Sequence, residues 1–286
     1  MFDQSFIVSV LAMGGLGVAF AACLAIASVK FRVEEDPVVE RVLECLPGTN
    51  CGACGYAGCH ALAEKMVSKD AAVNACPAGG QEVADMVAKA LGVEMVAAKR
   101  EVAVVLCRGG DAESVKSVSY RGDRTCASAV ITGGEKDCSY SCLGYGDCVK
   151  ACCFDSMGMN ANGLPEVFFD RCVGCGACAR ACPRDVIEMH PEDRTLFVYC
   201  RNRDKGAQAK KACKVACIGC SLCKKDCEVE GGINIDSFLA VIDYELCPQD
   251  DTPTKRCPTK CILNGENVKM TSAAFIALSA GKAQND

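Results

Sequence analysis

The sequence predicts an α+β fold divided among several small units, and three observations lead to it. An uncharged run opens the chain, four cysteines follow in a glycine-rich stretch, and a longer cysteine pattern then occurs twice. The 286 residues include 26 cysteines, 2 histidines and no tryptophan. Small units with so few aromatic residues need a second source of stability, and bound metal is one.

We expect six segments along the chain. They are a transmembrane anchor at 1–33, a small helical four-cysteine domain at 34–100, a connector with short strands at 101–135, a first cysteine-rich module at 136–195, a second such module at 196–265, and a tail at 266–286.

The uncharged run extends over residues 5–29. A helix of that length is roughly 37 Å long, enough to cross a hydrocarbon core of about 30 Å with some tilt. A signal peptide is the alternative, but it needs a basic stretch before the apolar run, where this chain has only Asp3. Because Lys30 and Arg32 follow the run, the positive-inside rule predicts that the rest of the chain faces the cytoplasm.

Cytoplasmic placement bears on what the cysteines do. Thiols stay reduced there, so metal ligation is favoured over disulfides, with zinc as the alternative metal. The net charge of −5 and the pI near 5.3 argue against nucleic acid as a partner. The sequence has no Walker loop or GxGxxG motif, so we expect no nucleotide to be bound by this chain.

The four-cysteine domain has the spacing Cys51-x2-Cys54-x4-Cys59-x16-Cys76. Glycines at 52, 55 and 58 allow the tight backbone that wraps a cubane cluster. The pattern predicts helices over 61–67 and 81–91, the second ending at Gly92. We expect Cys45, just outside the loop, to be a buried free thiol.

In the connector, residues 102–106 read as a strand that pairs with 118–120. Cys107 and Cys126 are ambiguous: they are either structural thiols, which we favour, or ligands of an unconventional cluster. The same two interpretations apply to Cys200 and Cys213.

The first module contains Cys172-x2-Cys175-x2-Cys178-x3-Cys182-Pro183, the run by which bacterial ferredoxins hold [4Fe–4S] clusters. Upstream, Tyr145 occupies the second position of a similar run, and Cys138 is the nearest replacement thiol. Cys153 stands where proline is usual and receives no role. We therefore assign one cluster to Cys138, Cys142, Cys148 and Cys182, and another to Cys152, Cys172, Cys175 and Cys178.

The second module repeats the first with an offset of 75 residues. Cys138 corresponds to Cys213 at this offset, and Cys126 corresponds to Cys200 one step out of phase. Strands are expected at 164–169 and 239–244. The complete ligand set of this module is Cys217, Cys220, Cys223 and Cys257.

The other site of the second module is degenerate. Asp250 and Pro253 replace two ligands, which leaves Cys227 and Cys247. Proline has no ligand atom, and carboxylate is a poor substitute for thiolate, so we expect no cluster here. Only a rearranged loop would let Cys261 or Cys213 rescue it. The sequence thus predicts four [4Fe–4S] clusters, or five if this site is filled.

The order of these motifs closely resembles the B subunit of the Rnf complex. The resemblance rests on LPGTNCGACGYAGC with ACPAGG, then CSYSCLGYGDCVKAC, CVGCGACARACP and CIGCSLCKKDC. It looks like the longer form of that protein, with two dicluster ferredoxin modules.

The resemblance implies a single-pass protein of the inner (cytoplasmic) membrane with its clusters on the cytoplasmic side. Such a protein takes electrons from soluble ferredoxin within a ferredoxin:NAD+ oxidoreductase that translocates Na+ or H+. Its partners are the other membrane and peripheral subunits, ferredoxin and the lipid bilayer. Carried over by motif, Cys51, Cys54, Cys59 and Cys76 bind the membrane-proximal cluster.

Two alternatives stay open at this point. The chain is also compatible with an iron–sulfur subunit of a hydrogenase or formate dehydrogenase, or with a membrane-tethered zinc scaffold.

Ferredoxins are acidic, so a basic patch is expected for docking. The candidates are Lys205, Lys210, Lys211 and Lys214, although a solvated charged face is the simpler interpretation.

Overall fold

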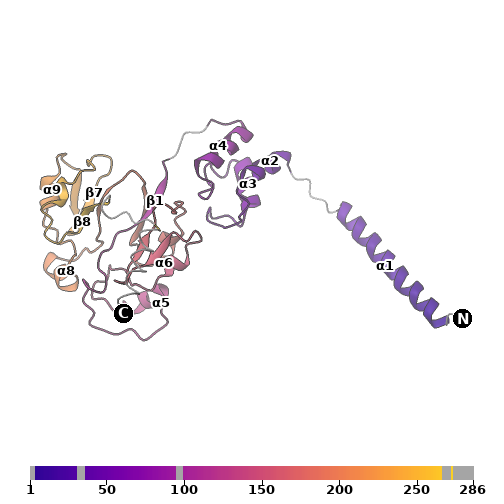
Figure 1. Ribbon diagram of the computed structural model, residues 1–286, viewed down its shortest axis with the longest axis horizontal. Helices are drawn as coiled ribbons and strands as arrows, with labels where there is room; N and C mark the ends of the chain where they lie inside the picture. Colours follow the sequence, from indigo (N-terminus) through magenta and orange to yellow (C-terminus); the bar gives the residue numbers. More distant parts are fainter. Residues whose placement is uncertain (1–3, 31–35, 95–98, 266–271, 273–286) are drawn as a thin grey trace.

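A computed structural model describes residues 4–30, 36–94, 99–265 and 272 (Figure 1). The first helix, α1 (Gln4–Lys30), has 27 residues. Within the described part of the chain, no helix is both long enough and apolar enough to cross a membrane. The anchor therefore stays a prediction. Arg32, used for its orientation, and nearly all of the tail lie outside the described residues.

The four-cysteine domain is a small helical unit made of α2 (Pro37–Cys45), α3 (Cys59–Val67) and α4 (Gly80–Leu91). Its core includes Val42, Leu62 and Val87, each 0–1% exposed. The two helices predicted here are confirmed, and Gly92 ends α4 in the left-handed conformation (φ 66°). Helix α2 was not predicted, although the side chain of Asp36 caps it by accepting the Val38 N–H.

The first module consists of two antiparallel ribbons and three short helices. One ribbon joins β1 (Glu101–Val105) to β4 (Ile187–Pro191), and the other joins β2 (Met157–Met159) to β3 (Pro165–Val167). The helices are α5 (Cys126–Thr132), α6 (Asp147–Lys150) and α7 (Ala177–Arg180). The strand predicted at 164–169 is thus found, as β3.

The pairing predicted for the connector strand is wrong. Residues 118–120 form no strand, and β1 instead pairs with β4, with Val102 opposite His190. Long-range pairing of this kind depends on how the module closes, which local sequence does not encode. The segment 101–135 therefore supplies an edge of the first module rather than a simple connection.

The second module repeats this plan. Its ribbons join β5 (Leu196–Val198) to β8 (Ile262–Asn264) and β6 (Ile233–Asp236) to β7 (Leu239–Ile242), the last confirming the strand expected at 239–244. Its helices are α8 (Gly206–Ala212), α9 (Leu222–Asp226) and the 3-10 turn η1 (Thr252–Thr254).

A close backbone approach also recurs in both modules. Gly144 (φ +83°) lies against the carbonyl oxygen of Gly163, and Gly219 (φ +64°) lies against that of Phe238. At both glycines a Cβ would come within 2.9 Å of that oxygen, so only glycine fits. Both pairs are related by the 75-residue offset seen in the sequence.

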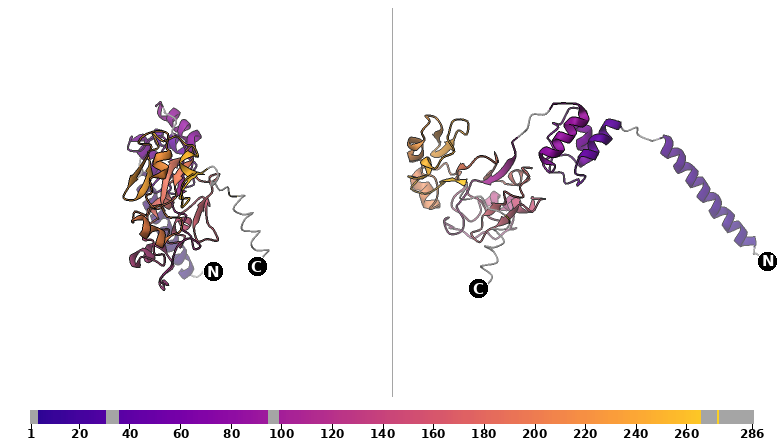
Figure 2. Two further views of the ribbon diagram at one scale, coloured as in Figure 1. Left: turned by 90° about the vertical axis from the view of Figure 1, so that its left-hand side faces the viewer. Right: turned by 45° about the horizontal axis from the view of Figure 1, so that its top comes forward.

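The two modules lie side by side (Figures 1 and 2), and residues in and just after β1 and β5 form a buried cluster between them. Val104 and Leu106 from one side meet Phe197 and Tyr199 from the other in one buried cluster. Phe197 is 2% exposed, and its ring lies 5.0 Å from that of His190. This contact fixes the cysteine-bearing loops that follow the two strands relative to one another.

Candidate iron–sulfur centres

In the four-cysteine domain, the loop before α3 and the segment before α4 bring thiols together. Cys59 and Cys76 are buried, and Cys51 and Cys54 are half-buried. The thiol of Cys76 faces those of Cys54 and Cys59, and burial is the main cause that raises its pKa. The Asn50 side chain holds the loop by accepting the Cys59 N–H at 2.8 Å. Cys45 donates to the Arg41 carbonyl, as a structural thiol does.

The run at Cys172 forms one side of a cavity. Cys152, Cys172, Cys175 and Cys178 all line it, which is the set expected from the sequence. The loop begins after β3, and α7 carries Cys178 into the interior, where it is 7% exposed.

A second cavity corrects one assignment. Its cysteines are Cys126, Cys142, Cys148 and Cys182, so Cys138 is not part of this set. Tyr145 leaves the second position of the run without a thiol, and Cys126 at the start of α5 supplies it from an inserted segment. The thiols of Cys126 and Cys182 both face Cys148. The missing thiol at Tyr145 was the signal, but spacing alone did not identify the replacement.

The second module has an equivalent cavity, lined by Cys217, Cys220, Cys223 and Cys257. A fifth thiol, Cys261, also lines it. Cys261 is hydrogen-bonded to two of the other sulfurs, which lowers the pKa of Cys217 to about 6 and that of Cys257 to about 5. The sequence reasoning gave Cys261 no such part.

The degenerate site is closed. Cys227 and Cys247 lie together, 3.7 Å between their sulfurs. Pro253, at the position of the missing third ligand, is fully buried. The carboxylate of Asp250 accepts the Thr252 N–H at 3.1 Å, at the start of η1.

Another four-cysteine cavity lies between the modules and was not predicted. It is lined by Cys107, Cys138, Cys200 and Cys213. The sequence alignment that matched Cys126 with Cys200 is wrong, because Cys107 is the residue that follows β1 as Cys200 follows β5. That equal distance from a strand end was the usable signal.

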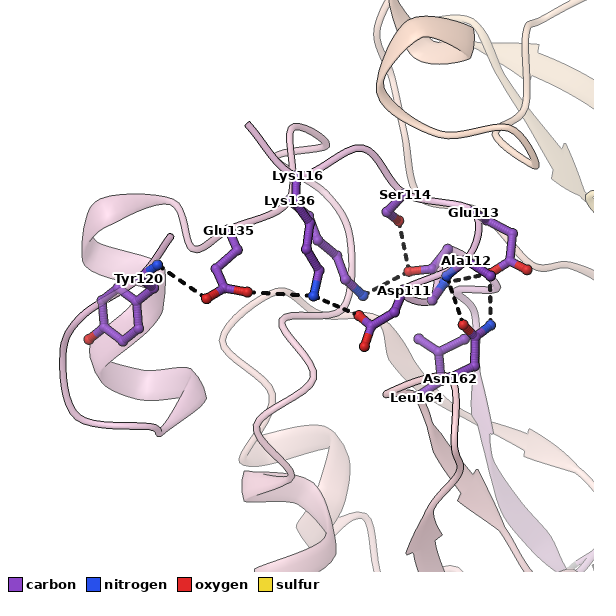
Figure 3. Close-up of polar contacts among 12 residues, drawn as sticks. Asp111, Ala112, Glu113, Ser114, Lys116, Tyr120, Glu135, Lys136, Asn162 and Leu164 are labelled. Carbon is purple, nitrogen blue, oxygen red and sulfur yellow. Dashed lines mark hydrogen bonds and ion pairs between the residues drawn. The ribbon is translucent and has the colours of Figure 1, made fainter. Parts of the chain in front are cut away.

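A buried lysine, Lys136, lies beside this cavity; Figure 3 shows its polar contacts. Lys136 is 7% exposed, and its Nζ donates to the Gly109 carbonyl at 2.8 Å. The hydroxyl of Ser114 donates to the same oxygen at 2.9 Å. Lys116 instead pairs with the carboxylates of Asp111 and Glu135 at the surface (Figure 3).

The donor set fits iron–sulfur clusters. All 26 cysteines, each within the described residues, are free thiols. Burial raises the pKa to about 12 for Cys142, Cys148 and Cys178. A thiol so buried loses its proton when a metal cation bound to sulfur compensates the charge. Four cavities, each lined by at least four thiols, suit one kind of cofactor.

Single-ion geometry is a different matter. Among the described residues, no three His, Cys, Asp or Glu side chains converge as a mononuclear metal site requires. Four sulfurs on one zinc ion lie roughly 3.8 Å apart, because each Zn–S bond is about 2.3 Å. In a cube each thiolate binds a different iron atom, so the sulfurs are more widely separated.

Two family models match the chain. Residues 46–78 match the model described as "Putative Fe-S cluster", and residues 165–188 match the 4Fe-4S binding domain. The first stretch contains the four-cysteine loop and the second contains the run at Cys172. Both matches agree with the mixed helix and sheet of the fold and with iron–sulfur binding.

Whole-chain relatives extend this result. The chain is 40% identical to the B subunit of the ion-translocating oxidoreductase complex of Methanosarcina acetivorans, covering 89% of this chain and 96% of the relative. It is 40% identical to the B subunit of the Na+-translocating ferredoxin:NAD+ oxidoreductase complex of Acetobacterium woodii, covering 92% and 79%. It is 38% identical to the proton-translocating counterpart of Clostridium ljungdahlii, covering 90% and 93%. The chain therefore belongs to the family of B subunits of ion-translocating ferredoxin:NAD+ oxidoreductases, the Rnf complexes.

Proposed function

We propose that this chain is the membrane-anchored iron–sulfur subunit of an Rnf-type complex. It accepts electrons from reduced ferredoxin and relays them to the other subunits. The complex couples ferredoxin oxidation and NAD+ reduction to Na+ or H+ translocation. The observation that carries this proposal is the set of buried cavities lined by cysteines from the ferredoxin-type runs. When bound, a [4Fe–4S] cluster takes up and gives back one electron at a time.

The chain's own residues hold and insulate these groups. We assign four clusters to four sets of thiols. The sets are Cys51, Cys54, Cys59 and Cys76; Cys126, Cys142, Cys148 and Cys182; Cys152, Cys172, Cys175 and Cys178; and Cys217, Cys220, Cys223 and Cys257. Apolar side chains such as Met157 and Ile187 line the cavities and exclude water, which is one of the factors that set a cluster's potential.

We assign no cluster to Cys227 and Cys247. Two thiols at 3.7 Å with a buried proline beside them support a packed core rather than a cofactor cavity. The carboxylate of Asp250 already accepts a hydrogen bond from the Thr252 N–H. In this module electrons then have a single cluster site of ferredoxin type.

The test of this assignment is the metal content of the full-length chain, purified without oxygen in detergent. We expect iron and acid-labile sulfide in equal amounts, with at least about 16 iron atoms per chain for four cubes. Zinc in place of iron, or iron without sulfide, would contradict the proposed electron-transfer function.

Membrane attachment is the second part of the proposal. The charges at the two ends of α1 suit an anchor with the cluster domains in the cytoplasm. Asp3 precedes the helix, and Lys30 is its last residue. We expect the full chain to stay in the membrane after alkaline extraction, and a chain that begins at residue 34 to be released.

The orientation has its own test. Cys153 is exposed and has no ligand role in our assignment, so it is a natural reporter. A maleimide that cannot cross membranes should label Cys153 in opened cells but not in intact ones. Labelling of Cys153 in intact cells would mean that the cluster domains lie outside the cytoplasm, contrary to the proposed orientation.

Docking of ferredoxin is assigned to α8 and its flanks. The lysines there are all exposed: Lys205, Lys210, Lys211 and Lys214. Acidic partners are steered by such a patch, and the resulting association weakens with ionic strength.

A further inference from the structure

The cavity between the two modules has no counterpart in either family match. Its four cysteines come in two pairs, Cys107 and Cys138 from the first module and Cys200 and Cys213 from the second. Cys138, Cys200 and Cys213 are 5–9% exposed. Buried thiols in such number need partners for their polar sulfur atoms.

The two pairs occupy equivalent places. Cys107 and Cys200 each follow a strand end by two residues, after β1 and β5. The backbone N–H of Cys142 donates to the sulfur of Cys107 at 3.4 Å, and that of Cys217 donates to Cys200 at 3.2 Å. Cys142 and Cys217 are themselves related by the 75-residue repeat and belong to the flanking cavities.

The sulfurs of this cavity act as hydrogen-bond acceptors. Besides the two contacts above, Asn202, which is 1% exposed, donates its Nδ2 to Cys138 at 3.2 Å. Its backbone N–H lies 3.4 Å from the sulfur of Cys200. The sulfur of Cys213 accepts the backbone N–H of Val215. Donors aimed at sulfur favour thiolates and are one of the means by which proteins tune bound clusters.

A buried positive charge supplies independent support. The Lys136 ammonium donates to a neutral carbonyl, Gly109 O, so this contact leaves its charge uncompensated. Gly109 itself lies against the cavity, since a Cβ there would come within 3.0 Å of Cys213 Sγ and 3.9 Å of Cys107 Sγ. Four thiolates around a cluster carry net negative charge, which is the counter-charge that a buried lysine needs.

We propose that Cys107, Cys138, Cys200 and Cys213 hold an additional [4Fe–4S] cluster at the interface of the two modules. This rests on the proposed function, because the chain must receive iron and sulfide at all. The cluster lies between the Cys126/Cys142/Cys148/Cys182 set and the Cys217/Cys220/Cys223/Cys257 set, and it joins the two modules into one electron path. It also replaces the view of Cys107, Cys200 and Cys213 as structural thiols and gives Cys138 a different ligand set.

The test compares iron, sulfide and EPR spectra of three full-length chains purified without oxygen. The first is the wild type, which should hold about 20 iron atoms for five cubes. The second is Cys138→Ala/Cys213→Ala, which removes one thiol from each module and should lose about four iron atoms and one reduced-cluster signal. The third is the matched control Cys227→Ala/Cys247→Ala, which removes two cysteines from the closed site and should keep about 20.

Each outcome decides the matter. About 16 iron atoms in the wild type overturn the inference, as does an unchanged count in Cys138→Ala/Cys213→Ala. A loss confined to Cys227→Ala/Cys247→Ala also overturns it, because the extra iron then belongs to the degenerate site. If Cys138→Ala/Cys213→Ala fails to fold, about 20 iron atoms in both other chains still support it. A wild type without iron and sulfide overturns the proposed function as well.

Discussion

The buried charge of Lys136 should set the reduction potential of the clusters next to it. An electron added to a cluster increases its negative charge, and a nearby ammonium stabilises that reduced form. The substitution Lys136→Met removes the charge but keeps most of the buried stem. The Gly109 carbonyl keeps its hydrogen bond from Ser114, so the local fold should survive.

The structure sets the size of the effect. Lys136 Nζ is 2.8 Å from Gly109 O, and a Cβ on Gly109 would lie 3.9 Å from Cys107 Sγ. Across the backbone of Gly109 these contacts bring the ammonium within roughly 11 Å of that sulfur. With an effective dielectric constant of about 20, a unit charge at that distance contributes about 1.5 kcal/mol. For a one-electron couple, loss of this charge lowers the potential by about 65 mV.

An EPR-monitored redox titration of the full chain measures this shift. The matched control is Lys116→Met, the same change at a lysine whose side chain is 36% exposed and already paired with two carboxylates. Solvent and those partners should limit its effect to about 15 mV. If Lys136→Met and Lys116→Met shift the potentials equally, the buried charge does not act on the clusters.

Three further outcomes are expected. Cys126→Ala should lose about four iron atoms, and adding Tyr145→Cys should restore them, because the second module has a cysteine at that position. Iron analysis of both variants measures this, and failure of the rescue would contradict the assignment of Cys126 as a ligand. Phe197→Ala should lower the free energy of unfolding by about 3–5 kcal/mol, measured by urea denaturation followed by circular dichroism, and a loss below about 1 kcal/mol would mean that the module interface contributes little. Lys210→Glu/Lys211→Glu should raise the KM for reduced ferredoxin at least about tenfold at low salt with unchanged iron content, and an unchanged KM would move the docking site elsewhere.

Much of the fold follows from local pattern. The helices before Gly92 and Ser68, the strands β3 and β7, and the set around Cys172 come from short spacings within one stretch of chain. A run such as Cys-x2-Cys-x2-Cys folds around its ligand through the conformation of a single loop. Repetition of the module then carries the same interpretation to a second place.

The errors share one physical cause, which is that tertiary packing selects partners far apart in sequence. Cys126 reaches its cavity from an inserted helix, and its distance from Cys142 follows no ferredoxin spacing. Cys107 and Cys200 meet because β1 and β5 pack together through Phe197 and its neighbours. Neither arrangement is encoded in a local motif. The sequence therefore showed which stretches carry ligand cysteines better than it showed which cysteines group together.

Electron uptake from ferredoxin tests the central claim most directly. Reduced ferredoxin is added without oxygen to the full-length chain of known iron content, and the electrons taken up are counted from visible absorbance and EPR. We expect rapid uptake of several electrons per chain, with a limit of about one per cluster and therefore about five. A chain that holds its full iron and sulfide yet takes no electrons from reduced ferredoxin would contradict its role as the subunit through which electrons enter.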